Sequence, residues 1–460
     1  MQYRSTRGGA VVDFKTALLN GLAPDGGLYV PVEIPVFSPQ KIASLAGLSY
    51  TELALEIMAP FTQGSFTREA LKPMIEAAYA SFRHAAIAPL VQIGPQHFVL
   101  ELFHGPTLAF KDFALQLLGH LLAASLPTGK RAVVLGATSG DTGSAAMAGC
   151  AGRDNLEIVI LYPEGRTSDV QRRQMTTLGA PNIHALAVDG TFDDCQDMVK
   201  ALFGDASFRE EVTLLAVNSI NFARVLAQIV YYFYAALRLG APAAKLSFTV
   251  PTGNFGDIYA GYLARAMGLP IERLTIASNR NDILTRCVAT GEYAMAGVAA
   301  SLSPSMDIEI SSNFERLLFD LFAQDGAALA AAMQNFRETK RLRLSTAQHA
   351  AFTRLFAAHA VDDAATLTQI QQTYAQAGYL LDPHTAVGVA ASAAVAAPGI
   401  TVTLATAHPA KFPDAVQQAT GISPALPPHL ADLFSRTERI TPMPRDLAAL
   451  KQFIRRCAVA

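Results

Sequence analysis

Two glycine-rich turns, each placed between an apolar run and a helical pattern, most constrain the fold of this chain. The first turn, TSGDTG at residues 138–143, follows the apolar run 132–135. The second, PTGNFGD at residues 251–257, follows the run 246–250. A turn of this kind at the start of a helix presents backbone N–H groups to an anion. Ordinary tight turns between a strand and a helix have similar compositions, so each motif by itself leaves that alternative open.

Apolar, strand-like runs alternate with helical patterns from about residue 90 onward. Several of these runs are continuously apolar, which is typical of parallel strands covered by helices on both faces. The sequence therefore predicts an α/β fold with open, mostly parallel sheets flanked by helices. Helical patterns include residues 193–203 and 221–239, and an alanine-rich section at 326–377 also reads as helical. The candidate strands are residues 97–102, 132–135, 158–162, 183–188, 214–217, 246–250, 274–277 and 401–406.

The length of 460 residues predicts more than one domain. Residues 1–90 combine a turn-rich opening with helical patterns and are predicted to form an N-terminal domain. Residues 91–460 are predicted to form the catalytic region. Within it we expect a smaller lobe at roughly 130–230, a larger lobe from the remainder, and a helix-rich insertion at roughly 290–377.

Composition argues against several classes of partner. The 36 basic and 38 acidic residues give a net charge of −2, which offers no attraction for nucleic acid or an anionic membrane. The uncharged run 385–407 is long enough to cross a bilayer, but Pro398-Gly399 interrupts it, so we predict a buried helix, a turn and a buried strand. No apolar signal core follows the N-terminus. Four cysteines without CxxC spacing predict no metal site and fit a reducing cytoplasm, where we expect this chain.

Lys111 is the strongest single catalytic candidate. It follows the Gly105-Pro106-Thr107 turn and opens an apolar helix. The positive end of the helix dipole and burial among phenylalanines both disfavour the ammonium form. A free amine is the state that a Schiff-base lysine needs. A solvated lysine that happens to lie beside a turn is the alternative reading of the same residues.

A possible anion site lies in Asn218-Ser219-Ile220-Asn221-Phe222-Ala223-Arg224. Asn218 or Ser219 is expected to cap the helix, and the arginine has the geometry to grip a phosphate. A capped helix with a surface arginine is the alternative. Several other side chains stay undecided between ligand contact and scaffold, with a structural role favoured for His408: Arg166, Ser168, Asn279, Arg280, His384 and His408.

In combination, these motifs resemble the threonine synthases, specifically their long bacterial and fungal form. The resemblance rests on HGPTLAFKDF at 104–113, ATSGDTG at 137–143, the NSxNxxR pattern at 218–224 and TAHPAKF at 406–412. The N-terminal YRSTRG and GLAPDGGLYVP segments resemble the same family. The family belongs to the fold-type II pyridoxal-phosphate enzymes. The resemblance therefore implies two open sheets, a separate N-terminal domain and pyridoxal 5′-phosphate as the cofactor, with no metal.

The resemblance also implies a role for individual residues. Lys111 would hold the cofactor, Asp141 would lie near its 3′ oxygen and titrate abnormally, and Thr406 would face its pyridine nitrogen. The cofactor phosphate would be held by Gly253, Asn254, Phe255, Gly256 and Asp257. Substrate binding would fall to Thr138, Ser139, Gly140 and Thr142 for the carboxylate and to Ser219, Arg224 and Asn254 for the phosphate.

The implied reaction converts O-phospho-L-homoserine and water into L-threonine and phosphate by γ-elimination and β-replacement. Two alternatives share the motifs. One is a phospho-lyase that releases 2-oxobutanoate from the same substrate, and the other is a binding protein that has lost catalysis. The expected partner is the small-molecule substrate, without nucleic acid or membrane, and the chain is expected to be a monomer or a homodimer.

Overall fold

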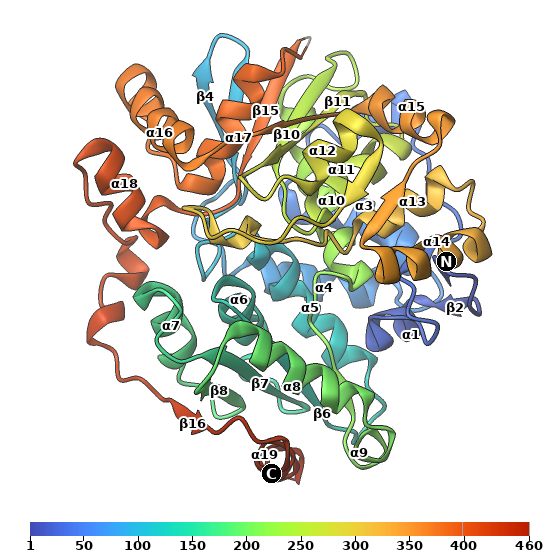
Figure 1. Ribbon diagram of the computed structural model, residues 1–460, viewed down its shortest axis with the longest axis vertical. Coiled ribbons are helices and arrows are strands. Elements are labelled where there is room, and N and C mark those ends of the chain that lie inside the picture. Colours follow the sequence, from blue (N-terminus) through green and yellow to red (C-terminus); the bar gives the residue numbers. More distant parts are fainter. Residues whose placement is uncertain (398, 460) are drawn as a thin grey trace.

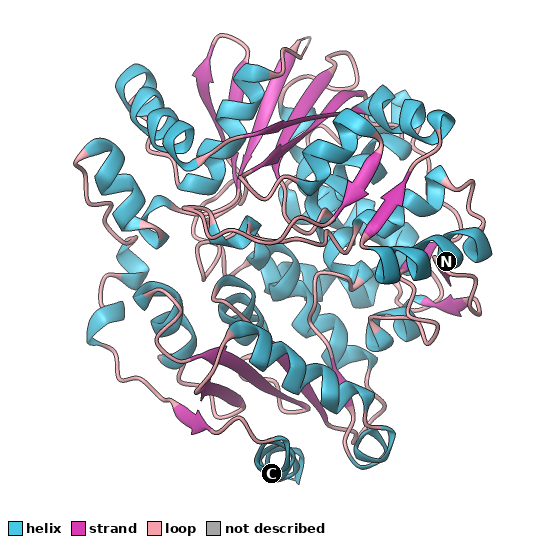
Figure 2. Ribbon diagram, in the orientation of Figure 1, coloured by secondary structure: helices cyan, strands magenta, loops and turns pink. Residues whose placement is uncertain are grey.

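Two sheets flanked by helices form the framework of the computed structural model, which describes residues 1–397 and 399–459 (Figures 1 and 2). In the larger sheet only the β4–β5 pair is antiparallel among the described strands. The predicted α/β class with mostly parallel sheets is confirmed. In spatial order the larger sheet contains β14 (Phe356–Ala360), β11 (Ile271–Ser278), β10 (Leu246–Pro251), β15 (Ile400–Ala405), β5 (His97–Glu101) and β4 (Leu90–Gly94).

The smaller sheet is parallel throughout its described pairs. Its edge strand β16 (Thr441–Met443) is followed in the chain by α19 (Leu447–Val459), which packs on α8 (Phe192–Gly204) and β6 (Ala132–Ala137). The predicted lobe boundaries assigned this C-terminal segment to the larger lobe, whereas its strand pairs with β8. The division into domains otherwise stays a prediction. In spatial order the sheet contains β16 (Thr441–Met443), β8 (Ile183–Val188), β7 (Leu156–Pro163), β6 (Ala132–Ala137) and β9 (Leu214–Leu215).

The N-terminal region contains a three-stranded antiparallel sheet and four helices. Two of its helices pack on the rest of the chain, with α3 (Tyr50–Thr62) against α10 (Phe222–Arg238) and α4 (Arg68–Tyr79) against α5 (Lys111–Ser125). Capping by Ser49 begins α3, where the capping box to Glu52 satisfies exposed backbone donors. The elements are β1 (Gln2–Ser5), β2 (Val12–Asp13), β3 (Tyr29–Pro31), α1 (Phe14–Asn20), α2 (Pro39–Ser44), α3 (Tyr50–Thr62) and α4 (Arg68–Tyr79).

Helix α10 (Phe222–Arg238) forms the centre of the core because nearly all of its side chains are buried. It contacts α3, α5 and α11 (Gly256–Ala266). The other helices and short strands are α5 (Lys111–Ser125), α6 (Asp141–Cys150), α7 (Asp169–Thr176), α8 (Phe192–Gly204), α9 (Ala206–Glu211), α11 (Gly256–Ala266), α12 (Ile283–Thr290), β12 (Glu292–Ala294), η1 (Pro304–Met306), α13 (Phe314–Leu321), α14 (Gly326–Thr339), β13 (Arg341–Arg343), α15 (Thr346–Leu355), α16 (Asp363–Ala377), α17 (Pro383–Ala394), η2 (Pro409–Lys411), α18 (Pro413–Thr420), η3 (Pro428–Leu430) and η4 (Leu433–Ser435).

Two segments, residues 326–377 and 385–407, allow the predicted secondary structure to be compared with the observed one. The alanine-rich section 326–377 contains helices, as predicted, but also β13 and the sheet strand β14. Pairing with β11 extends the larger sheet and outweighs the helix propensity of alanine in that strand. The uncharged run 385–407 contains most of α17 and the strand β15, while Pro398 lies outside the described residues. No helix within the described part of the chain has the length and apolarity required to span a bilayer.

Candidate active site

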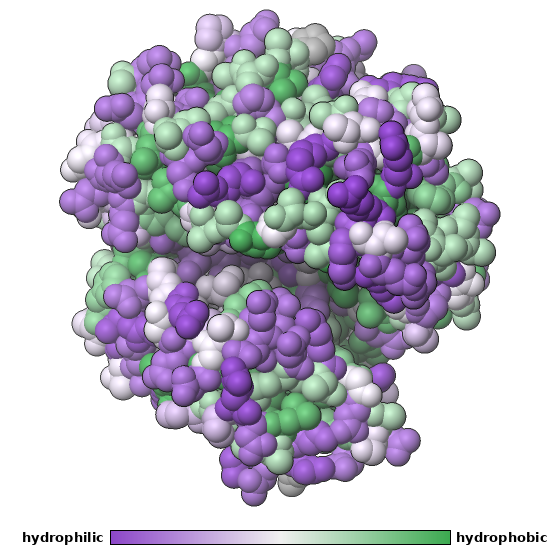
Figure 3. All heavy atoms as spheres, in the orientation of Figure 1, coloured by the Kyte–Doolittle hydropathy of each residue, from purple (hydrophilic) through white to green (hydrophobic). Residues whose placement is uncertain are grey.

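The predicted site residues follow strands of both sheets, at their carboxyl ends, where open α/β sheets bind ligands. The molecular surface is hollowed by a groove between the part built on the larger sheet and the part built on the smaller sheet (Figure 3). Thr138 follows β6, Gly253 follows β10 and Thr406 follows β15. The fold therefore directs chain segments that are far apart in sequence toward one region.

Lys111 begins α5 beside the end of β15. The backbone N–H of Phe110 donates to the carbonyl of Thr406 at 2.8 Å, and Ala109 forms a β-bridge with Ala407. These bonds fix the start of the helix directly against the segment that carries Thr406. The resemblance implies that Lys111 and Thr406 contact opposite parts of the cofactor. The backbone hydrogen bond between Phe110 and Thr406 therefore holds these two residues close together.

The Lys111 side chain is nearly buried, with 11% of it exposed. Its Nζ lies 3.1 Å from Asp141 Oδ2 and 5.0 Å from the centroid of the Phe110 ring. Burial lowers the pKa of Lys111; Asp141 opposes this shift, while the charges of Lys411 and Arg224 add to it. The structure thus excludes the solvated-lysine alternative, and the direction of the shift favours the free amine.

Asp141 is the first residue of α6 and is buried between two lysines. Its Oδ1 accepts from Gln171 Nε2 at 2.9 Å and lies 2.7 Å from Lys411 Nζ. Its Oδ2 contacts Lys111 and accepts from Ser305 Oγ at 3.2 Å. Burial alone would raise the pKa of Asp141, but the charges of the two lysines outweigh it and hold the pKa well below its usual range. This shift comes from the lysines, and the abnormal titration expected for Asp141 beside the cofactor stays a prediction.

Lys411 is a site residue that the sequence reasoning left without a role. Its side chain is fully buried, and its Nζ donates to the carbonyl of Thr107 at 2.7 Å besides pairing with Asp141. A charged side chain in an apolar segment directly after a predicted strand was the available signal, because such a lysine needs a buried counterion. The sequence did not indicate which carboxylate that would be.

The side chain of Thr138 stabilises the first glycine-rich turn through hydrogen bonds to the turn's backbone. Thr138 Oγ1 accepts from the N–H groups of Gly140 at 3.0 Å and Gly143 at 2.9 Å, whereas Ser139 is exposed. Gly140 has a φ of 151°, and a Cβ there would lie 2.4 Å from Gln171 Cδ. Only glycine fits this position without displacing the side chain that also binds Asp141.

The second turn is supported by three residues that sequence reasoning missed. Ser311 Oγ donates to the carbonyl of Gly253 at 2.6 Å, and Ser312 Oγ donates to Asn254 Oδ1 at 3.2 Å. Asn313 donates to the carbonyl of Asn254 from its backbone N–H at 3.0 Å and from Nδ2 at 3.1 Å. Phe255 adopts the left-handed φ of 63° at the start of α11, which turns the chain into the helix. No local pattern marks residues 311–313 as partners of this turn.

Asp257 contributes to the second turn through its backbone alone. Its carboxyl group is buried against α10, where Oδ1 accepts from Tyr231 at 2.5 Å and Tyr232 at 3.0 Å. Burial raises the pKa of Asp257 to about 7, against the two tyrosine hydrogen bonds that lower it. The backbone N–H at the start of α11 is therefore the group of Asp257 that suits an anion.

Arg224 is buried in the first turn of α10, which contradicts the surface-arginine alternative. One guanidinium nitrogen donates to the carbonyl of Val217 at 3.1 Å, and Nε has no hydrogen-bond partner among the described residues. Burial lowers the pKa of Arg224 to about 10. A buried cation with a spare donor is suited to an anionic ligand.

The predicted cap of α10 is wrong. Neither Asn218 nor Ser219 caps the helix; Asn221 does, with Oδ1 accepting from the N–H of Ala223 at 3.1 Å. Asn221 Nδ2 also donates to the carbonyl of Leu18 at 2.8 Å. Asn221 therefore connects the start of α10 to the N-terminal region. Ser219 is half-buried and does not serve as the cap.

Most of the undecided side chains have scaffold contacts. His408 Nδ1 accepts from the N–H of Ala410 at the start of η2, and burial lowers its pKa to about 4. His384 lies 2.9 Å from Asp382 through Nδ1 and accepts from the N–H of Ser305 at 3.2 Å. Ser168 caps α7, Asn279 donates to Ser303 and Asp307 on either side of η1, and Arg166 and Arg280 are exposed.

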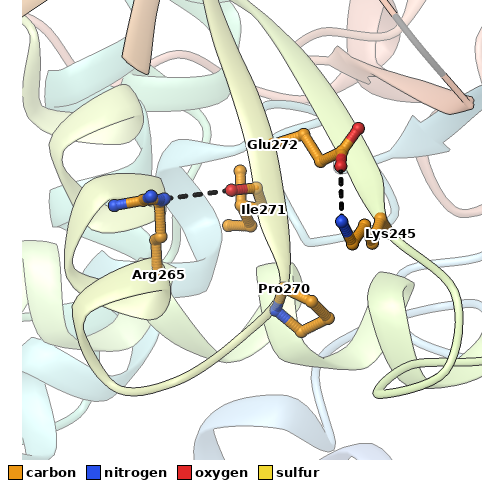
Figure 4. Close-up of a pocket in the computed structure, with 5 residues that line it drawn as sticks. All are labelled: Lys245, Arg265, Pro270, Ile271 and Glu272. Atoms are coloured by element: carbon orange, nitrogen blue, oxygen red, sulfur yellow. Dashed lines mark hydrogen bonds and ion pairs between the residues drawn. The ribbon is translucent and has the colours of Figure 1, made fainter. Parts of the chain in front are cut away.

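A cavity of about 460 Å³ lies at the amino ends of β10 and β11, away from the carboxyl ends that carry the predicted site (Figure 4). Arg265 Nε donates to the carbonyl of Ile271 at 3.0 Å, and Lys245 pairs with Glu272 at 3.1 Å. Each of its charged side chains thus already has a protein partner, and the cavity lies away from the carboxyl ends of the strands, so we do not assign it to catalysis.

Known sequence families match the chain along most of its length. The family described as "Threonine synthase N terminus" matches residues 2–79. The family "Pyridoxal-phosphate dependent enzyme" matches residues 88–404, and "Threonine synthase, C-terminal" matches residues 385–454.

Individual relatives agree with these matches. A threonine synthase from Pseudomonas aeruginosa is 54% identical over 99% of this chain and 98% of its own length. The crystal structure of a pyridoxal-phosphate-bound threonine synthase from Brucella melitensis covers all of both chains with a TM-score of 0.98 and 51% identity. The yeast threonine synthase structure covers 100% of this chain and 99% of its own, with a TM-score of 0.94 and 41% identity. The chain belongs to the threonine synthase family of fold-type II pyridoxal-phosphate enzymes.

Proposed function

We propose that this chain is a threonine synthase that converts O-phospho-L-homoserine and water into L-threonine and phosphate, with Lys111 as its catalytic lysine. The single observation that carries the proposal is the buried cluster of Lys111, Asp141, Lys411 and Arg224 at the carboxyl ends of the strands. An amine beside this many cations suits a reaction whose substrate and cofactor are both phosphate esters.

The residues fit pyridoxal phosphate. Lys111 is a buried lysine with a lowered pKa, and Thr406 is joined to its helix through the backbone. The turn at 253–257 ends at the start of α11, where the first N–H groups have no acceptor within the helix. When bound, the cofactor withdraws electrons from the carbons next to the substrate amino group and so acidifies their protons.

The chain's own residues would divide the work as follows. Lys111, as a free amine, removes the proton at the α carbon and moves protons at the neighbouring carbon. Ser219, Arg224 and Asn254 bind the substrate phosphate and stabilise its negative charge as it leaves. Thr138, Ser139, Gly140 and Thr142 bind and orient the substrate carboxylate at the start of α6. Asp141 holds the Lys111 amine in place through Oδ2.

The test is an assay of purified protein with pyridoxal phosphate and O-phospho-L-homoserine in which phosphate, threonine and 2-oxobutanoate are measured together. We expect threonine and phosphate in equal amounts. Phosphate matched by 2-oxobutanoate would identify a phospho-lyase, and absence of phosphate would reject the substrate. Lys111→Ala is expected to abolish turnover, and a Lys111→Ala protein that still formed threonine would refute the assignment of this lysine.

A further inference from the structure

Lys411 is held by two contacts in the interior. It ends η2, the short turn after β15, and no part of its side chain is exposed. Its Nζ is 2.7 Å from the carbonyl oxygen of Thr107 and 2.7 Å from Asp141 Oδ1. A buried ammonium without a counterion costs several kcal/mol. The pairing with Asp141 supplies that counterion.

Two lysines share the carboxylate of Asp141, one at each oxygen. Lys411 approaches Oδ1 at 2.7 Å, and Lys111 approaches Oδ2 at 3.1 Å. The other partners of the carboxylate among the described residues, Gln171 and Ser305, are neutral. One carboxylate thus faces two potential ammonium groups, and the arrangement carries an excess positive charge unless one amine gives up its proton.

The other charged groups around the cluster do not remove this excess. Arg224 on α10 adds a positive charge that acts on Lys111. Asp112 on α5 also interacts electrostatically with Lys411; its negative charge offsets the positive charge of Arg224, so the excess in the cluster remains. Burial raises the pKa of Asp112 to about 6.

Lys111 is the amine better placed to lose the proton. Its contact with the carboxylate is the longer one, and it lies at the positive end of α5. Lys411 has a second acceptor in the Thr107 carbonyl, which stabilises its ammonium form. The difference between the two lysines follows from their positions alone.

We propose that Lys411 is a positioning residue that competes with Lys111 for the Asp141 carboxylate and thereby leaves Lys111 as the free amine that carries the cofactor. The proposal rests on the proposed role of Lys111. Without Lys411, Asp141 has Lys111 as its one ammonium partner, and the proton stays on Lys111. Lys411→Arg keeps a positive charge at this position, which still competes with Lys111 for the Asp141 carboxylate.

The experiment measures how fast cofactor-free protein takes up pyridoxal phosphate, followed by absorbance, between about pH 6 and about pH 10. Lys411→Met is expected to move the midpoint of the pH profile upward by about one pH unit, which makes uptake near neutral pH about tenfold slower. Lys411→Arg is expected to keep the midpoint close to that of the parent protein. Lys245→Met, which removes an exposed lysine, serves as the matched control.

Each outcome bears on the proposal. An unchanged midpoint in Lys411→Met, or an equal shift in Lys411→Arg, would overturn it. If Lys411→Met does not fold by circular dichroism, Asp141→Asn tests the same idea, because removing the shared anion should move the midpoint downward. Borohydride reduction and mass spectrometry of the parent protein identify the modified lysine separately. A modified residue other than Lys111 would refute the proposed function of Lys111 rather than the competition.

Discussion

At the scale of single residues, burial determines what the polar side chains of the site can do. Arg224 has lost its solvent and has one protein carbonyl as a partner, so its spare donor is available to a ligand. Lys111 has lost its solvent next to other cations, so its proton is destabilised. The same physical cause thus supports the proposed roles of Arg224 in binding an anion and of Lys111 as a base.

Arg224→Met should mainly impair use of the phosphorylated substrate. A charge-assisted hydrogen bond to phosphate contributes about 1.5 to 3 kcal/mol, so kcat/KM for O-phospho-L-homoserine should fall by roughly tenfold to a hundredfold or more. Steady-state kinetics together with a titration of cofactor binding would test this. Arg209→Met, which alters an exposed arginine of α9, is the matched control. Unchanged kcat/KM in Arg224→Met would exclude Arg224 from substrate binding.

Asp257 should make stability depend on pH. Because burial raises its pKa from the ordinary 3.8 to about 7, the folded protein binds a proton more tightly than the unfolded chain. This contribution is complete below about pH 4 and is lost as the pH rises toward about 7, an effect of up to about 4 kcal/mol. Asp257→Asn cannot lose that proton. Its stability relative to the parent should therefore increase between about pH 5 and pH 8 in urea denaturation. A difference independent of pH would contradict the raised pKa.

At the scale of elements, the contact between α5 and α6 sets the distance between Lys111 and Asp141. Each helix carries one of these residues at its start. The helices cross at Gly119 and Gly149, where a Cβ on Gly119 would lie 2.0 Å from the carbonyl oxygen of Gly149. A Cβ on Gly149 would lie 2.2 Å from the carbonyl oxygen of Leu115. The two helices therefore approach backbone to backbone, which side chains at these positions would prevent.

Gly149→Ala should push the two helices apart. We expect a loss of about 1 to 3 kcal/mol in the free energy of unfolding, as for other overpacked cores, together with weaker cofactor binding. Thermal unfolding and a pyridoxal phosphate titration measure the two effects. Gly204→Ala is the control, because a Cβ there meets no atom within 4 Å and the residue ends a helix without a positive φ. Equal stability of the two variants would show that the crossing tolerates a methyl group.

At the scale of the whole molecule, Arg316 connects the N-terminal region to the two segments proposed to bind phosphate, residues 218–224 and 251–257. It is fully buried and donates to the carbonyl of Tyr29 at 3.0 Å, to the carbonyl of Ile220 and to Asn313 Oδ1. Asn313 in turn supports the glycine-rich turn of α11. The neighbouring Glu315 accepts from Thr6 and Arg7 of the N-terminal strand segment. One arginine side chain thus binds the N-terminal region and both segments at once.

Arg316→Met should weaken both the fold and substrate binding. Each buried acceptor that loses its donor costs about 1 to 3 kcal/mol, so unfolding should occur at a markedly lower temperature. KM for O-phospho-L-homoserine should rise because the Ile220 and Asn313 segments lose their common anchor. Differential scanning calorimetry and steady-state kinetics test the two effects, and Arg337→Met on the exposed face of α14 is the control. An unchanged KM in a folded Arg316→Met protein would limit this arginine to stability.

The sequence by itself determined the local units of this protein. Apolar runs predicted β8 over 183–188 with its observed bounds and placed β6 and β10 before the two glycine-rich turns. The helix start at Lys111 could also be predicted. These features depend on residues that are neighbours in the chain, since strand burial, glycine conformations and helix dipoles act over a few residues.

Only the tertiary structure decided which distant groups share an environment. The pairing of Lys411 with Asp141, the support of Asn254 by Asn313 and the burial of the Asp257 carboxyl against α10 join segments that are far apart in sequence. The same holds for β14 and β16, whose places in the sheets come from their strand partners. Local patterns do not encode such pairs, because side-chain burial and the pKa values that follow from it are fixed only when the whole core packs.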